Sequence, residues 1–294
     1  MLDRLFALFG YRIFRHKTLG FRLLPLDEKA QKGTLQRPAP VDVRELGNDP
    51  RILGYHDRPV LVHALLAHGR NSACVPMDDP NGLNPFVQAA RLAAQGRPLT
   101  EVRDNLLEHH DNTAEESLLA RLGLTAEQAP GLVEFDRDPF ALSMRPWDSR
   151  SAEHFRAKAL KRKAKRKRFE KGETPEQWAM RHAKRLNTLT DSVMRNGLLR
   201  NDGPSGDIEA TALVNPAGLW RWQTIKGHHR AAVLSALEYR EVPVRITRLV
   251  REDEVNLWPN VANGLFSEGA AARVFRRHFD GAPQARAETG AATD

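Results

Sequence analysis

The chain has 294 residues, enough for one large domain or two small ones, and it is 41% hydrophobic and 28% charged, as folded proteins usually are. A mean hydropathy of −0.53 and the lack of a long apolar run exclude a spanning helix, and the single cysteine, Cys74, excludes a disulfide framework or a multi-cysteine zinc site. We therefore expect a cytoplasmic protein. The net charge of +8 favours a polyanionic partner: a nucleotide, DNA, RNA or an acidic membrane surface.

Residues 1–26 are expected to form an amphipathic segment. Arginines lie on one part of the helical wheel, and apolar residues recur at helical spacing at Leu2, Leu5, Phe6, Phe9 and Ile13. Such a helix either docks on the protein's own core or lies at a membrane interface. The second alternative would place the protein peripherally at the inner face of the membrane.

Residues 27–150 are expected to be mostly helical. Glycines and prolines make 27–55 loop-rich, and 58–63 is interpreted as a short buried strand or the start of a helix. Helices are predicted at 86–95, 99–109, 114–122 and 125–128, with Gly123 as a C-cap. A break follows around Met144–Asp148, and nothing in this region has a catalytic signature.

Residues 151–173 are predicted to be a basic connector. The run 156–171 carries the densest positive charge of the chain, in Lys161, Arg162, Lys163, Lys165, Arg166, Lys167 and Arg168. Two interpretations remain open: a solvated or disordered connector, or a contact with nucleic-acid phosphates or acidic lipids.

Residues 174–255 have a regular α/β pattern. A capping box at Thr174–Gln177 opens a helix that ends at Gly197. Strands are predicted at 208–214 and 219–225 as a hairpin, then a helix at 228–239 and a strand at 242–247. Trp220 and Trp222 share one face of their strand and are expected in the core. Residues 256–280 are predicted as C-terminal helices, and 281–294 as a disordered tail.

The most informative run is Lys226-Gly227-His228-His229-Arg230, which is predicted to end a strand and open a helix. Helix N-termini present unbonded N–H groups, and a glycine lets a ligand approach closely, so the pattern predicts an anion site suited to phosphate. Consecutive helical residues point in different directions, so His228 and His229 are not expected to hold one metal ion.

An ordered series runs through Thr174–Arg248: 192–199, the two strands, 227–232, 237–239 and 242–246. This series resembles the ParB/sulfiredoxin superfamily. The tail at 258–279 resembles an uncharacterised bacterial branch associated with surface polysaccharides. The resemblance implies an α+β protein: a mostly helical N-terminal region plus a small ParB/sulfiredoxin-like α/β domain with a short mixed sheet. It also implies that the Gly-x-x-Arg turn holds nucleotide phosphates, with Gly227 allowing close approach, Arg230 in bidentate contact and Ser192 bordering the base or ribose.

The chain also departs from members of this superfamily. His228 stands where sulfiredoxins have their catalytic cysteine and partition proteins have glutamate. Free-serine kinases share the Gly-His-x-Arg turn but have an acidic residue where Lys226 stands.

The first hypothesis is an ATP-dependent phosphotransferase (kinase) or NTPase that acts on a small molecule or surface-polysaccharide precursor. Its cofactor would be ATP or another NTP with Mg²⁺. Glu176 is the candidate catalytic residue by position. The alternatives are a ParB-like nucleic-acid-binding protein or nuclease that uses 156–171, and a nucleotide-gated membrane-associated regulatory protein.

Overall fold

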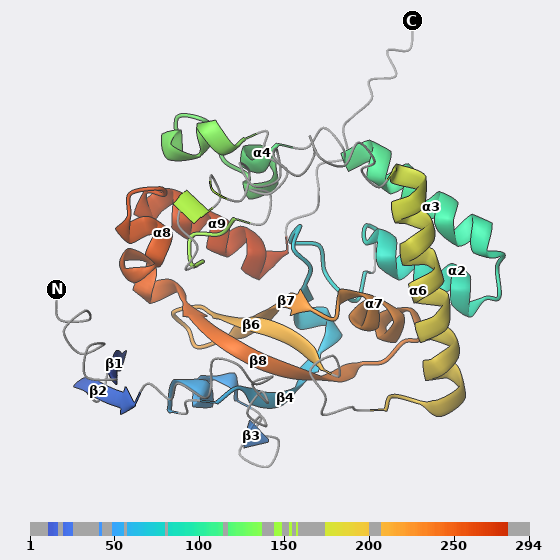
Figure 1. Cartoon of the computed structure of the whole chain (residues 1–294), viewed down its shortest axis with the longest axis horizontal. Coiled ribbons are helices and arrows are strands. Elements are labelled where there is room, and N and C mark those ends of the chain that lie inside the picture. The colour runs from blue at the N-terminus through green and yellow to red at the C-terminus, as the bar shows by residue number, and fades with distance from the viewer. Residues whose placement is uncertain are drawn as a thin grey trace, which may run out of the picture. The chain divides into compact units, whose positions relative to one another are not determined.

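A computed structural model describes residues 11–16, 20–25, 41–42, 49–55, 58–79, 82–113, 117–136, 144–148, 174–199 and 207–281, with the helical residues 153, 154 and 157. The chain divides into two units, Met1–Pro38 and Ala39–Asp294 (Figure 1). The basic residues at 161–168, most of the expected connector and the tail at 282–294 lie outside the described residues.

The first unit contains an antiparallel hairpin of β1 (Tyr11–His16) and β2 (Gly20–Pro25), with Ile13 opposite Leu23. The predicted amphipathic helix is therefore wrong for residues 11–25. Aromatic and β-branched residues are concentrated in the β1 sequence, and Gly20 begins the return strand, so strand preference prevails over the helical spacing. The rest of the predicted helix, residues 1–10, lies outside the described part.

The second unit is built on a mixed sheet with the strand order β3-β4-β8-β6-β7-β5. The strands are β3 (Val41–Asp42), β4 (Val60–Leu65), β5 (Gly69–Arg70), β6 (Ile208–Val214), β7 (Trp220–Lys226) and β8 (Glu241–Arg251). The β4–β8 and β6–β7 pairs are antiparallel, and the other neighbours are parallel. The expected α+β class and the hairpin at 208–226 are confirmed.

The sheet draws strands from both halves of the sequence. Val62 of β4 pairs with Val244 of β8, and Gly69 of β5 pairs with Trp222 of β7. The ranges 27–150 and 174–255, which we expected as separate regions, therefore share one sheet. Of the two interpretations of 58–63, the buried strand is confirmed.

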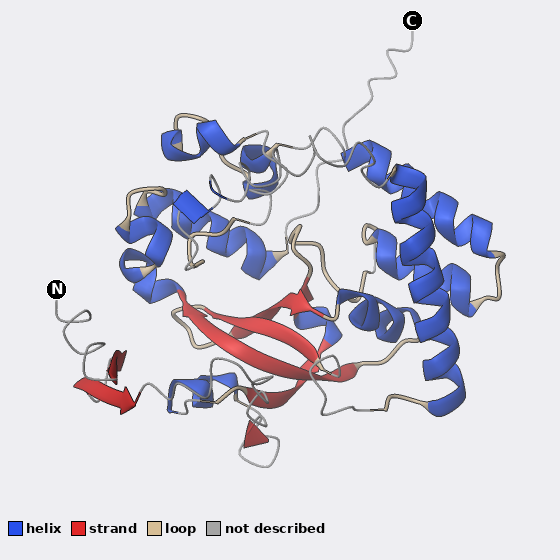
Figure 2. Cartoon of the chain, viewed as in Figure 1, coloured by secondary structure: helices blue, strands red, loops and turns tan. Residues whose placement is uncertain are grey.

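Four helices pack together in one layer (Figures 1 and 2). They are α2 (Pro85–Ala94), α3 (Leu99–Thr113), α6 (Pro175–Asn196) and α7 (His228–Ala236). Ala89, Val102, Leu186 and Val233, one from each helix, belong to a common buried cluster. The predicted capping box opens α6, where Thr174 N–H donates to Gln177 Oε1 (3.1 Å) and Gln177 N–H donates to Thr174 Oγ1 (3.3 Å). α7 ends three residues earlier than predicted, because the chain turns at Glu238 with a φ of 62°.

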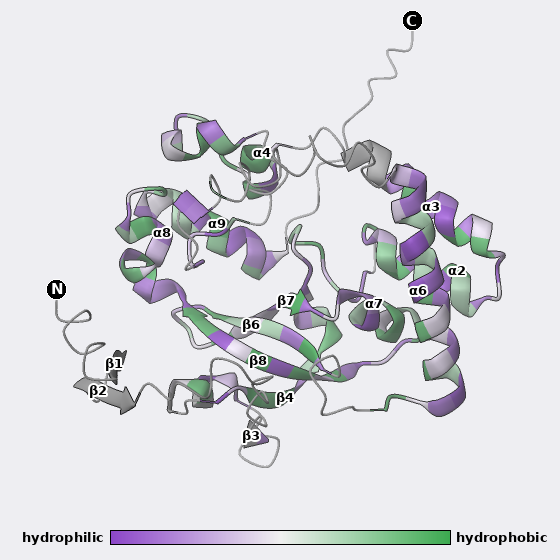
Figure 3. Cartoon of the chain, in the orientation of Figure 1, coloured by the Kyte–Doolittle hydropathy of each residue, from purple (hydrophilic) through white to green (hydrophobic). Residues whose placement is uncertain are grey.

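A second helical group has a separate buried cluster. Its elements are α4 (Leu118–Leu122), η4 (Pro130–Phe135), η6 (Glu252–Leu257), α8 (Pro259–Ala262) and α9 (Glu268–Asp280). Two further 3-10 helices, η2 (Pro50–Tyr55) and η3 (Leu66–His68), lie elsewhere. Gly123 caps α4 with a φ of 68°, as predicted, whereas residues 125–128 form a hydrogen-bonded turn and not the predicted helix. Figure 3 shows hydrophobic residues along the central strands and hydrophilic residues gathered on the outer helices α3 and α6. No helix among the described residues is long and apolar enough to cross a membrane.

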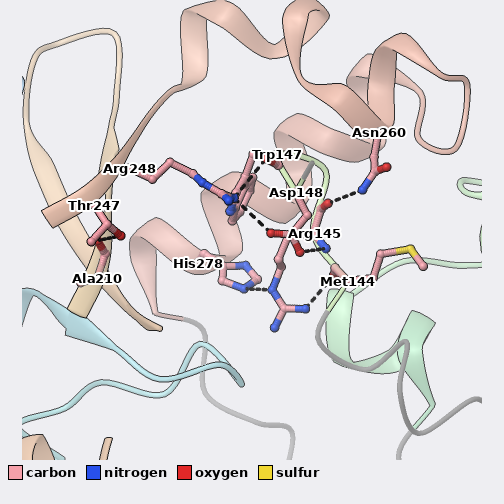
Figure 4. A network of polar contacts seen from close by, with 9 residues as sticks. All are labelled: Met144, Arg145, Trp147, Asp148, Ala210, Thr247, Arg248, Asn260 and His278. Carbon is pink, nitrogen blue, oxygen red and sulfur yellow. Dashed lines mark hydrogen bonds and ion pairs between the residues drawn. The ribbon is translucent and has the colours of Figure 1, made fainter. Parts of the chain in front are cut away.

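The segment Met144–Asp148 is held by a buried polar network (Figure 4). Arg145 donates from Nε to His278 Nε2 at 2.7 Å, and its backbone carbonyl accepts from Asn260 Nδ2 at 2.8 Å. Asp148 accepts from Arg248 at 3.1 Å. Burial, followed by the charge of Arg145, holds the pKa of His278 well below its usual range, so the ring is neutral and can accept. The predicted break at Met144–Asp148 is therefore a segment that hydrogen bonds hold against the C-terminal helices α8 and α9.

Candidate functional site

The turn between β7 and α7 has the geometry that the sequence predicts. Gly227 has a φ of 83°, and a Cβ there would lie 3.0 Å from Ile208 Cα, so both conformation and space favour glycine. The first bond of α7 runs from Ala231 N–H to Gly227 O at 2.9 Å. The three amides before Ala231 have no acceptor one turn back within α7 and add to the positive end of the helix dipole.

A pair of histidines joins α6 to the start of α7. The distance between His182 Nδ1 and His229 Nε2 is 2.6 Å, and the two ring planes are inclined by only 11°. Such nearly parallel rings, joined nitrogen to nitrogen, form an edge-to-edge hydrogen bond in which one ring donates and the other accepts. The side chains are 8% and 6% exposed, so water does not compete for the bond.

Burial is the largest cause that lowers the pKa of His229, to about 3, and the neighbouring His228, His182, Arg185 and Arg181 act in the same direction. The pKa of His228 is also lowered, first by the surrounding protein and then by Arg185, although its side chain is exposed. Both imidazoles are therefore neutral at pH 7.

Two aromatic rings enclose this pair. Phe86, at the start of α2, meets the rings of His182, His228 and His229 edge-on, with centroids 5.5, 5.5 and 5.2 Å away. Trp178 lies one turn before His182 on α6, with ring centroids 4.6 Å apart. The N-terminal half of the sequence thus contributes to the site through Phe86. We call Phe86, Trp178, His182, His228 and His229 the histidine cluster.

Positive charge surrounds the same turn. Arg181 and Arg185 are exposed on α6 and act electrostatically on His229. Arg230 is half-buried and lines a small hollow with Asp207 and Ile208. Burial lowers its pKa, and the charge of Asp207 opposes that shift. Lys226 Nζ lies 3.3 Å from Glu209 Oε2, in an ion pair between neighbouring strands.

The turn itself consists of five of the seven predicted site residues: Lys226, Gly227, His228, His229 and Arg230. Ser192 is exposed on α6, ten residues or about 15 Å along the helix axis from His182. Glu176 lies in the first turn of α6 and lines a shallow surface hollow with Arg103, Gln177, Met180, Arg181 and Lys184. It precedes His182 by six residues, a rotation of about 240°, so it belongs to a different face of the helix from the histidine pair.

Sequence reasoning missed His182, Phe86 and Trp178 as site residues. A signal for His182 was present, because it falls on the buried stripe of α6 beside Ala179, Ala183 and Leu186. A histidine within an otherwise apolar stripe needs a polar partner. The partner, His229, could not be identified without the packing of α6 against α7.

The described residues hold no group of three side chains suited to ligating a metal ion. In comparisons with protein-family models, curated proteins and solved structures, this chain has no match.

Proposed function

We propose that the N-terminus of α7 binds the phosphate groups of a nucleotide, and that the protein is a nucleotide-dependent phosphotransferase or NTPase with a ParB/sulfiredoxin-like domain. The observation that carries the proposal is the start of α7. A left-handed glycine, a helix N-terminus and the cations Arg181, Arg185, Lys226 and Arg230 occur there together. Such a combination favours a multiply charged anion.

The arrangement of elements supports the domain assignment. The hairpin β6–β7, the glycine turn, α7 and β8 follow one another in the order that the resemblance implies. In space, β6 lies between β7 and β8, pairing antiparallel with the first and parallel with the second. The turn that would hold phosphate thus follows β7, which lies next to β6, one of the two central strands of the sheet.

The neutral state of His228 suits phosphate binding. A neutral imidazole can donate one N–H to a phosphate oxygen and accept a proton at its other nitrogen. A bound dianion would oppose the effect of Arg185 and raise the pKa of His228, so binding near pH 7 is expected to take up protons.

Carboxylates beside the turn come from β6 and from the residue just before it. Glu209 lies opposite Lys226 in the β6–β7 register, and Asp207 lies near Arg230. Oxygen ligands of this kind suit Mg²⁺, which is commonly held by one or two carboxylates together with substrate phosphates. When bound, Mg²⁺ would neutralise charge on the phosphoryl group. Glu209 and Asp207 are therefore better placed than Glu176 to serve the proposed reaction.

Calorimetric titration of ATP, CTP and GTP, each with Mg²⁺, tests the proposal. We expect at least one nucleotide to bind wild-type protein, and Arg230→Ala to weaken that binding at least tenfold. Arg273→Ala is the matched control, because it removes the same charge from an exposed position on α9. Repeating the titration in buffers of different ionisation enthalpy measures the expected proton uptake.

Turnover is tested separately with labelled nucleotide. Glu209→Gln is expected to reduce Mg²⁺-dependent release or transfer of phosphate by more than it reduces nucleotide binding. Failure of all three nucleotides to bind folded wild-type protein would refute the proposal. The same titration with DNA, RNA and acidic vesicles would then test the polyanion alternatives.

A further inference from the structure

A cavity of about 190 Å³ lies next to the histidine cluster. The loop Asn71–Val75 forms one side, and the start of α2 with Phe86 forms another. His109 of α3, Arg121 of α4 and Trp178 of α6 complete the lining. Five separate parts of the chain thus converge on one partly open cavity.

The cavity shares two walls, Phe86 and Trp178, with the histidine cluster. Phe86 lines the cavity and also lies 5.5 Å, between ring centroids, from His228, the first residue of α7. Trp178 lines the cavity and contacts His182. A ligand held by the start of α7 would therefore have this cavity within reach, on the other side of Phe86.

The loop Asn71–Val75 is held in place before any ligand arrives. Asn71 Oδ1 accepts from Ala73 N–H at 2.8 Å and from Val75 N–H at 3.0 Å. The Ser72 carbonyl accepts from Arg145, the residue at the centre of the buried network in Figure 4. A wall fixed by these contacts lowers the ordering cost of binding.

The lining selects for a planar ring that carries polar atoms. Aromatic faces from Phe86 and Trp178 suit stacking or edge contact with a heterocycle. Asn71, Ser72, His109 and Arg121 supply hydrogen-bonding groups around the same space. Pockets for drug-sized ligands usually measure about 300–1,000 Å³, so this smaller cavity suits one ring system and not a whole nucleotide.

We infer that this cavity holds the base of the nucleotide whose phosphates bind at the start of α7. The assignment rests on the proposed function and extends it. The base, and not only the phosphate chain, contributes to affinity, and residues from the N-terminal half of the sequence recognise it.

The test compares ATP with inorganic tripolyphosphate, which has the phosphates but no base. We expect wild-type protein to bind ATP at least tenfold more tightly than tripolyphosphate. Ala73→Phe, which fills the cavity, should reduce ATP affinity to the tripolyphosphate level and leave tripolyphosphate affinity unchanged. Ala262→Phe, at an exposed position of α8, is the matched control and should retain the preference for ATP.

Three outcomes would overturn the assignment. In the first, wild-type protein binds tripolyphosphate as tightly as it binds each of ATP, GTP, CTP and UTP. In the second, Ala73→Phe unfolds at the wild-type temperature and keeps the full preference for ATP. In the third, none of ATP, GTP, CTP and UTP binds and tripolyphosphate does not bind either, which refutes the proposed function and this assignment with it. The first two leave the phosphate site intact, so the two failures are distinguishable.

Tryptophan fluorescence gives a readout that does not depend on whether Ala73→Phe folds. Trp178 lines the cavity, so ATP should change the emission of wild-type protein and tripolyphosphate should not. Trp178→Phe should abolish the change. An ATP-induced change that persists in Trp178→Phe would place the base elsewhere.

Discussion

Mild acid is expected to destabilise this protein through His229, and His229→Gln should remove part of that sensitivity. The pKa of His229 is about 3 in the folded protein, because burial and nearby positive charge disfavour its cation, whereas its ordinary value is 6.5. Between these pH values the unfolded chain binds a proton that the folded protein does not. The stabilising contribution is therefore complete above pH 6.5 and is lost progressively as the pH falls towards 3.

The size of the effect follows from the pKa difference. Each pH unit below the ordinary pKa lowers the free energy of unfolding by about 1.4 kcal/mol. At a pH of about 5 this one group therefore lowers it by roughly 2 kcal/mol. His229 is only 6% exposed, so solvent screening reduces the figure little. For a folded unit of this size, 1 kcal/mol corresponds to about 2–4 °C in melting temperature, and the expected shift from His229 is about 4–8 °C.

Urea unfolding at about pH 7.5 and about pH 5 measures this contribution by linkage. His228 and His278, whose pKa values are also lowered, give wild-type protein further acid sensitivity of the same sign, so the comparison with His229→Gln isolates one residue. Glutamine keeps a hydrogen-bonding group towards His182 but does not titrate. His63→Gln controls for loss of a histidine outside the cluster. Equal losses of stability on acidification in wild-type protein and His229→Gln would show that the folded protein does not lower the pKa of His229.

Two substitutions test packing at glycines, and one tests the buried network of Arg145. Gly227→Ala should lower the free energy of unfolding in urea more than Gly264→Ala does. Both glycines have a positive φ, but only at Gly227 would a Cβ lie 3.0 Å from a backbone atom. Equal losses in the two variants would contradict the close approach of Ile208 Cα to Gly227. Arg145→Met should lower the free energy of unfolding by about 3–5 kcal/mol, since it leaves the acceptors of a buried network unpaired, and a loss below about 1 kcal/mol would show that the network contributes little. Gly69→Ala should cost about 1–3 kcal/mol, because the new Cβ overlaps the Trp222 ring, and an unchanged melting temperature would mean that the ring moves freely.

Local signals predicted local structure well. The capping box at Thr174, the hairpin turn before Trp220 and the glycine at 227 each depend on residues within a few positions of one another, and the structure has all three. The error at residues 11–25 came from the same kind of reasoning. The helical spacing runs from Leu2 to Ile13 and reaches only Ile13 in this range. The aromatic and β-branched residues of β1 favour a strand, and a short segment does not decide between the two.

Long-range pairing could not be predicted from the sequence. β4 pairs with β8 across about 180 residues, Val62 opposite Val244, and each strand by itself is only a short apolar run. Placing 27–150 and 174–255 in separate regions followed from treating those runs one at a time. For the same reason the sequence could indicate Gly227 and Arg230 but not Phe86, which reaches the turn only because α2 packs against α6 and α7.

The register of the β6–β7 hairpin bears on Lys226, the residue at which the turn differs from that of the free-serine kinases. Free-serine kinases, which the turn resembles, have an acidic residue at the position before the glycine. Compared by sequence position alone, the lysine at that place argues against a shared mechanism. Antiparallel pairing, however, places Glu209 opposite Lys226, with 3.3 Å between Oε2 and Nζ. A carboxylate therefore lies beside the turn, supplied by the neighbouring strand. Phosphoryl transfer depends on where a carboxylate lies relative to the phosphate, not on its sequence position, so the lysine does not by itself exclude the proposed activity.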